Sequence, residues 1–197
     1  MAMPDPAPGP ARPAHWRRRA LALAGAVFVL DQLVKWGVLA GLDLATRGRL
    51  SLLPFLDFTL VWNRGISMNL PLGDLVGRAG LIGLTLLVVI WLLRWLWRSQ
   101  RPVEALALGA VVGGALGNVL DRVIHGAVVD FVHLHAFDYH FYVFNVADAA
   151  ITLGVAALLV DGLRDRAKTP TNPERPSSGT NGADTHSNRK GGASRDQ

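Results

Sequence analysis

Four long apolar runs dominate the chain, separated by shorter stretches in which charged and polar residues gather. The runs cover residues 20–42, 77–97, 103–120 and 143–163, and the third can be extended to residue 124. An α-helix rises about 1.5 Å per residue, so roughly 20 apolar residues span the hydrocarbon core of a bilayer, which is about 30 Å thick. The pattern therefore predicts four transmembrane helices.

The segment between the first two runs has a different pattern. Residues 50–63 read LSLLPFLDFTLVWN, with β-branched and aromatic residues that partly alternate from Phe55 onward. Pro54 and Asp57 interrupt the segment, which favours a short strand or hairpin on the membrane surface over a further span. The predicted fold class is an all-α membrane protein with four transmembrane helices and a small extracytoplasmic β element between helices 1 and 2.

Composition supports an integral membrane protein. Half of the 197 residues are hydrophobic, 18% are charged, and the mean hydropathy is +0.28. Cysteine is absent, which excludes disulfides and thiolate nucleophiles. The formal charge of +5 does not indicate a nucleic-acid partner, because the basic residues cluster between the apolar runs as they do at membrane surfaces.

These basic clusters predict the orientation of the helices. They comprise Arg12 with residues 17–19, then Arg94, Arg98 and Arg101, and finally Arg164, Arg166 and Lys168. With four spans they all fall on one side, which the positive-inside rule makes the cytoplasmic side. We therefore expect a basic cytoplasmic N-terminus over residues 1–19, a membrane domain over residues 20–163 and a disordered cytoplasmic tail over residues 164–197.

A cleaved signal peptide is the alternative interpretation of the first run, since a basic stretch precedes an apolar one. The run continues past Asp31 and Lys35 without a small-residue cleavage site, so a transmembrane helix is favoured. Asp31 and Lys35 are four residues apart and share one helix face. They form either a neutralised structural pair or part of a functional site.

Two further groups of polar residues lie at the outer ends of helices 3 and 4, where each needs an explanation because polar groups are costly in a membrane. The helix 3 group is Asn118, Asp121 and Arg122, on one face. The helix 4 group is Asn145 and Asp148, three residues apart.

Asp130 follows the turn that Gly126 permits, so Asp121, Asp130 and Asp148 all fall near the same membrane face. The ionisation of both members of a close carboxylate pair is costly, so one keeps a proton while the other stays charged, and such a pair can activate water and protonate a leaving amine. A dyad uses only two acids, and Asp121 adjoins Arg122, which favours a charge-paired structural role for it. Solvated interface carboxylates, a proton relay of a transporter and a non-enzymatic scaffold are the alternatives.

Other chemistries are less well supported by the sequence. No H-E-x-x-H motif or phosphate-binding loop is present, and we expect no metal and no organic cofactor. His133 and His135 are interpreted as surface or interface histidines. The spacing of Gly109, Gly113 and Gly117 predicts close helix packing.

Five short motifs occur in order along the chain: DQLVK at residues 31–35, NRG at 63–65, GGALGNVLDR at 113–122, VVDF at 128–131 and FNVAD at 144–148. Together they resemble lipoprotein signal peptidase, also called signal peptidase II, a family of bacterial inner-membrane aspartic peptidases. The resemblance covers residues 20–163. One departure follows the NRG motif, where the family's aromatic residue is replaced by Met68.

The resemblance implies an enzyme that cleaves signal peptides from diacylglyceryl-modified prolipoproteins, just before the lipidated cysteine, at the outer face of the inner membrane. It implies that Asp130 and Asp148 are the catalytic pair. It also implies substrate-binding or supporting roles for Asn63, Gly65, Asn118, Asp121, Arg122, Asn145, Asp31 and Lys35. The expected partners are the prolipoprotein substrate and membrane lipid, and a monomer suffices.

Overall fold

The computed structural model describes residues 14–65, 73–136 and 139–168. Its elements in chain order are α1 (Ala14–Gly41), α2 (Leu44–Arg47), β1 (Arg49–Leu53), β2 (Leu56–Asn63), α3 (Gly73–Arg98), α4 (Pro102–His125), β3 (Val128–Ala136), β4 (Tyr139–Phe144) and α5 (Val146–Lys168). Four of them, α1, α3, α4 and α5, are long and apolar enough to cross a membrane. The prediction of four membrane-spanning helices is confirmed.

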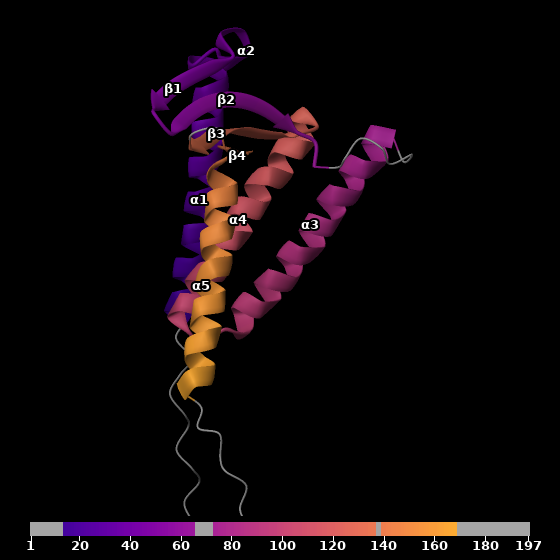
Figure 1. Cartoon of the computed structure of the whole chain (residues 1–197). Helices are drawn as coiled ribbons and strands as arrows, with labels where there is room; N and C mark the ends of the chain where they lie inside the picture. Colours follow the sequence, from indigo (N-terminus) through magenta and orange to yellow (C-terminus); the bar gives the residue numbers. More distant parts are fainter. Residues whose placement is uncertain (1–13, 66–72, 137–138, 169–197) are drawn as a thin grey trace, which may run out of the picture.

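Helix α4 is the centre of the bundle. It packs against α1, α5 and α3, and 72% of its span is buried inside the protein, against 22% or less in each of the other three. Helix α3 packs mainly on α4 and leans away from the rest of the bundle (Figure 1). Most of the surface of α3 therefore faces the bilayer.

Glycines on α4 allow its neighbours to approach closely. A methyl group added at Gly109 would lie 2.3 Å from the carbonyl oxygen of Ala20, and one at Gly113 would lie 2.4 Å from that of Ala24. Neither distance is sterically possible, so α1 reaches α4 only because these positions lack a side chain. The packing role predicted for these glycines is confirmed.

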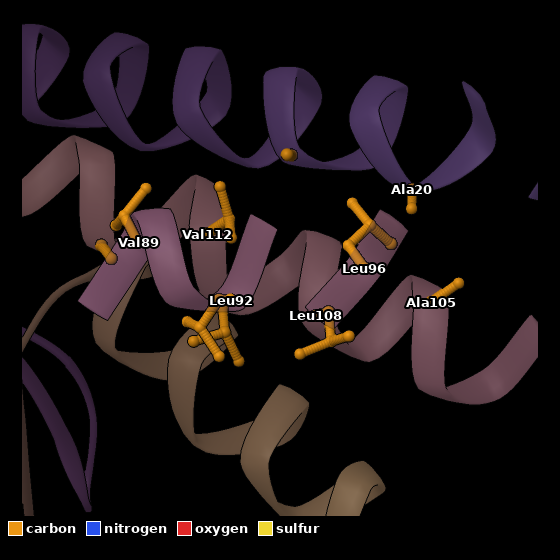
Figure 2. Packing of buried hydrophobic residues seen from close by; sticks show 10 residues of the cluster. Ala20, Val89, Leu92, Leu96, Ala105, Leu108 and Val112 are labelled. Atoms are coloured by element: carbon orange, nitrogen blue, oxygen red, sulfur yellow. The ribbon is translucent and has the colours of Figure 1, made fainter. Parts of the chain in front are cut away.

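Apolar side chains fill the space where α1, α3 and α4 meet. Figure 2 shows this cluster, in which Ala20 of α1, Leu92 and Leu96 of α3, and Leu108 and Val112 of α4 are all buried. A second cluster joins the C-terminal end of α1 to the sheet through Val38, Leu44 and Phe131. The sheet is thus attached to the bundle by its own apolar contacts.

The four strands form one antiparallel sheet in the order β1-β2-β3-β4. The hairpin β1–β2 agrees with the strand or hairpin predicted between the first two helices. The hairpin β3–β4, between α4 and α5, was not predicted. Residues 139–144 are mostly aromatic, which suits a strand, but Val143 and Phe144 also extend the apolar run of the following helix.

As a consequence, α5 begins at Val146 rather than at residue 143, and the polar side chain of Asn145 marks its start. The Asn145 Oδ1 accepts a hydrogen bond from the Asp148 backbone N–H at 2.9 Å, which is an N-cap interaction. The helix continues to Lys168, so residues 164–168 of the segment predicted as a tail are helical. Residues 169–197 lie outside the described residues.

The sheet lies at the end of the bundle opposite the beginning of α1 and the end of α5 (Figure 1). Gly126, which ends α4, has a φ of 76°, a left-handed conformation that glycine adopts without strain. The chain leaves α4 there and enters β3 directly. The polar ends of α1, α4 and α5 therefore meet beneath the strands.

Candidate active site

The side chains of Asp130 and Asp148 meet where β3 passes the start of α5, and Asn145 contacts both. The Asn145 Nδ2 donates to Asp130 Oδ1 at 2.7 Å, and the Asn145 backbone N–H donates to Asp148 Oδ2 at 3.3 Å. The remaining oxygens accept from Asn63 Nδ2, which reaches Asp130 Oδ2 at 2.9 Å, and from Asn118 Nδ2, which reaches Asp148 Oδ1 at 2.8 Å. Three amide side chains thus hold two carboxylates in place.

The two carboxylates have different surroundings. Asp130 is 1% exposed, and burial, with a further contribution from the negative charge of Asp148, raises its pKa to about 6, although hydrogen bonds from Asn63 and Asn145 act in the opposite direction. Asp148 is half-buried and lies in the first turn of α5, where the backbone N–H groups favour negative charge. The two carboxyl groups therefore differ in environment, and Asp130 holds a proton to higher pH than an ordinary aspartate does.

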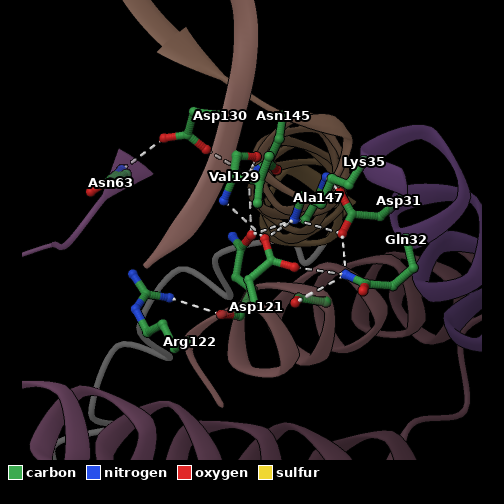
Figure 3. A network of polar contacts seen from close by, with 12 residues as sticks. Asp31, Gln32, Lys35, Asn63, Asp121, Arg122, Val129, Asp130, Asn145 and Ala147 are labelled. Atoms are coloured by element: carbon green, nitrogen blue, oxygen red, sulfur yellow. Dashed lines mark hydrogen bonds and ion pairs between the residues drawn. The ribbon is translucent and has the colours of Figure 1, made fainter. Parts of the chain in front are cut away.

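Beneath the pair, the buried ammonium of Lys35 contacts three side chains, one on its own helix α1 and two on α4. Its Nζ lies 2.7 Å from Asp31 Oδ2, 2.7 Å from Asp121 Oδ2 and 3.2 Å from Asn118 Oδ1 (Figure 3). Lys35 is only 2% exposed, so it does not extend to the outer interface. Because Asn118 also binds Asp148, the Lys35 group is continuous with the carboxylate pair.

The two acids that contact Lys35 also hold the backbone on which the carboxylate pair is built. Asp121 Oδ2 accepts from the N–H of Val129 at 3.0 Å, and Asp31 Oδ1 accepts from the N–H of Ala147 at 2.8 Å. Val129 immediately precedes Asp130, and Ala147 immediately precedes Asp148. Each buried acid therefore positions one of the two carboxylates through the main chain.

The sequence suggested Arg122 as the ionic partner of Asp121, and the structure corrects this: the partner is Lys35. Successive residues of a helix point about 100° apart, so neighbours do not face each other. Arg122 instead donates from Nη1 to the backbone carbonyl of Asn118 at 3.2 Å. Its Nε is buried without a hydrogen-bond partner among the described residues.

Gly65 connects the end of β2 to this arginine. Its N–H donates to Asn63 Oδ1 at 2.9 Å, its φ is 75°, and a methyl group there would lie 3.2 Å from Arg122 Nη2. A side chain at this position would be strained and would press on the guanidinium. Every residue predicted for the site thus belongs to one connected group. The Met68 departure lies outside the described residues.

Two residues of this group were not predicted. Gln32 donates to Asp121 Oδ1 at 3.0 Å and to the carbonyl of Gly117 at 3.3 Å. Tyr142 on β4 accepts a hydrogen bond from Asn63 Nδ2 at 2.7 Å. Gln32 is an uncharged polar residue inside an apolar run, and this is a signal that sequence reasoning could have used. Tyr142 lies close to Asn63 only because β4 forms a hairpin with β3, and this hairpin was not predicted.

The histidines of β3 lie elsewhere in the sheet. His135 Nε2 is 2.7 Å from Asp57 on β2. Burial would raise the pKa of Asp57, but hydrogen bonds and positive charge from Arg49 outweigh it and lower that pKa. In the described ranges, no three His, Cys, Asp or Glu side chains gather in a way that would hold a metal ion.

Comparison with known proteins identifies the family of the chain. Residues 23–164 match a family model described as signal peptidase (SPase) II. The lipoprotein signal peptidase of Methylorubrum extorquens (strain PA1) is 48% identical over 148 residues, which cover 74% of this chain and 86% of the relative. That of Rhodopseudomonas palustris is 44% identical over 147 residues, which cover 72% and 90%.

Solved structures show the same fold. A bacterial membrane enzyme determined at 2.3 Å resolution superposes with a TM-score of 0.66 at 26% identity, covering 80% of this chain and 95% of that one. A second, at 1.9 Å resolution, gives 0.66 at 28% identity and covers 75% and 94%. On the extent of the family match and the identity to its curated relatives, the chain belongs to the signal peptidase II family of membrane proteases.

Proposed function

We propose that this protein is an aspartic endopeptidase that removes signal peptides from diacylglyceryl-modified prolipoproteins, cutting on the N-terminal side of the lipidated cysteine. The observation that carries the proposal is the bridge formed by Asn145 between the carboxylates of Asp130 and Asp148. Two acids held by the side chain and the backbone of one residue, one acid with a pKa of about 6, are suited to general acid–base hydrolysis of a peptide.

In the proposed reaction, a water molecule occupies the space between the carboxylates and the scissile peptide. Ionised Asp148 accepts a proton from this water as its oxygen attacks the carbonyl carbon. Protonated Asp130 then donates its proton to the departing amine as the carbon–nitrogen bond breaks. The shared proton belongs to the pair, so its titration is a property of both residues together.

Arg122 supplies positive charge next to the reacting groups. Its guanidinium interacts electrostatically with both Asp148 and Asp130, and its buried Nε has no hydrogen-bond partner among the described residues. The negative charge that develops on the carbonyl oxygen during attack needs such a donor. We assign Arg122 to substrate binding or oxyanion stabilisation, with Gly65 leaving room for it.

The proposed location is the inner membrane of a bacterium, with the site facing the periplasm. Basic residues at the end of the bundle that carries the beginning of α1 and the end of α5 support a cytoplasmic position for that end, and the sheet lies at the other end (Figure 1). One copy of the chain contains the complete site, so we propose a monomer.

The test is cleavage of a purified diacylglyceryl-modified prolipoprotein by the detergent-solubilised protein in the presence of EDTA. We expect a product whose first residue is the lipidated cysteine, identified by mass spectrometry. The same precursor without the diacylglyceryl group is the matched control and should be cleaved far more slowly. A folded protein that leaves the modified precursor intact would refute the proposal and favour a transporter or scaffold.

The proton on Asp130 predicts the pH dependence. Since the pKa of Asp130 is raised to about 6, the singly protonated pair is lost as the pH rises through that value, and kcat/KM should fall with it. The hydrogen bond from Asn63 favours the ionised form of Asp130, so Asn63→Ala should move the alkaline limb to higher pH. Thermal unfolding over the same pH range separates this effect from loss of structure. An unchanged limb in Asn63→Ala would contradict the assignment of the acid.

A further inference from the structure

A groove of about 570 Å³ runs between α1, α3 and α4, on the membrane-embedded part of the bundle. Its lining is entirely apolar and includes Leu21, Gly25 and Phe28 of α1, Leu93 of α3, and Leu116 and Val123 of α4. The catalytic proposal assigns nothing to this space. It runs along the transmembrane helices from Leu21 of α1 to Val123 of α4, which is next to Arg122 in the chain, and its lining includes no residue of the carboxylate pair.

Two rows of lining residues continue from the groove toward the end of the bundle at which α1 begins. One turn beyond Leu21, on the same face of α1, is Arg17, and one turn beyond Leu93 of α3 is Trp97. The Arg17 guanidinium lies over the Trp97 ring at 5.3 Å from its centre. These two side chains therefore mark the mouth of the groove at this end. Arg18 lies there too, because it is two turns from Gly25 on one face of α1.

Charge is distributed unevenly at this end of the bundle. On the α4–α5 side, Arg101 pairs with three acids, Glu104 at 3.5 Å, Asp161 at 3.3 Å and Asp165 at 3.1 Å. On the groove side, neither Arg17 nor Arg18 has an acidic partner within residues 14–65, 73–136 and 139–168. The mouth of the groove is therefore cationic, whereas its interior is apolar.

We propose that this groove binds an anionic glycerophospholipid, with one acyl chain in the groove and the phosphate at Arg17 and Arg18. An apolar groove of about 570 Å³ with arginines at one end suits an acyl chain that is joined to an anionic headgroup. Arginine near a membrane surface attracts anionic lipid. No residue of the carboxylate pair lines the groove, and the lipid site does not depend on the proposed reaction.

The experiment measures lipid retained by the detergent-purified protein in native mass spectrometry after addition of either phosphatidylglycerol or phosphatidylcholine. The wild-type protein should retain phosphatidylglycerol at least about five-fold better, the effect of roughly one arginine near a membrane surface. The Arg17→Gln, Arg18→Gln variant should retain the two lipids about equally. A wild-type protein without a preference for phosphatidylglycerol would overturn the proposal.

The matched control is Arg94→Gln, Arg98→Gln, which removes the same charge from α3. These arginines lie about 100° around the helix from Leu93 and Trp97, away from the groove, so the preference should persist. If the control loses the preference as completely as the α1 variant does, general surface charge explains it and the specific site is refuted.

A third variant tests the acyl chain. Nothing lies within 4 Å of a methyl group added at Gly25, so Gly25→Leu should fill the groove without a clash and lower retention of both lipids. Unchanged retention would show that the chain lies elsewhere. Thermal unfolding and size-exclusion chromatography establish that each variant is folded. If Gly25→Leu does not fold, the arginine variants still test whether the phosphate binds at Arg17 and Arg18.

Discussion

Asp130→Asn and Asp148→Asn are each expected to lower kcat for prolipoprotein cleavage by about 10³-fold or more. Asparagine keeps the shape of the side chain and one acceptor oxygen, so the bridging contacts of Asn145 can persist. It has no proton to exchange with water or with the leaving amine. A positioned general acid or base accelerates a reaction roughly 10²–10⁴-fold. Both acids are needed in the same steps, so the loss of either one should remove this acceleration.

Asp43→Asn is the matched control for these variants. Asp43 has a φ of 47°, which asparagine tolerates as well as aspartate does, and its hydrogen bond is to Thr46, outside the site. The control should retain full activity. Normal cleavage by either dyad variant would refute the aspartic mechanism. If Asp121→Asn abolishes cleavage while both dyad variants retain it, the enzyme stands but the dyad is wrongly assigned.

The second large effect concerns stability: Lys35→Met should lower the free energy of unfolding by about 3–5 kcal/mol. The ammonium is the positive partner of both Asp31 and Asp121 at 2.7 Å, and all three side chains are buried. Its removal leaves two like charges in a medium of low dielectric constant. Unfolding followed by tryptophan fluorescence during titration with a denaturing detergent measures the change.

A triple variant, Lys35→Met with Asp31→Asn and Asp121→Asn, separates charge from packing. Its asparagine oxygens can still accept from the N–H groups of Ala147 and Val129, and no unpaired charge remains. It should recover a large part of the stability that Lys35→Met loses. If the triple variant is less stable than Lys35→Met, or Lys35→Met equals the wild type, the electrostatic explanation is wrong.

The helices were predictable because each has an uninterrupted apolar run of sufficient length, and such a run has few other structural solutions. The hairpin β3–β4 was not, because its last two residues, Val143 and Phe144, belong to the same apolar run as the helix that follows. Only Asn145 separates the two, and its capping contact with Asp148 is a property of the folded backbone. Hydropathy detects burial in a membrane but does not distinguish the strand from the helix here.

The sequence could show which acids and amides in the apolar runs are candidates for the site, because polar side chains are costly there and mark functional sites. Their pairing was not predictable. That Asp121 contacts Lys35 rather than Arg122 depends on how α1 crosses α4, which the glycine contacts at Gly109 and Gly113 determine. The contact between Asn63 and Tyr142 likewise depends on the order of strands in the sheet. These are relations between elements, and no local pattern encodes them.

The pair formed by Asp31 and Lys35 within one helix has a consequence for biosynthesis. A lone charge at the centre of a membrane costs about 2.5–3.5 kcal/mol during insertion, yet α1 must enter the bilayer before its partners exist. Since the two groups lie 2.7 Å apart on the same helix, α1 inserts as a neutral unit. Asp121 then arrives with α4 and the N–H of Ala147 with α5. Both acids of the proposed dyad follow α4 in the chain. A partly synthesised protein that ends before α5 therefore lacks a complete site while other nascent chains enter the membrane.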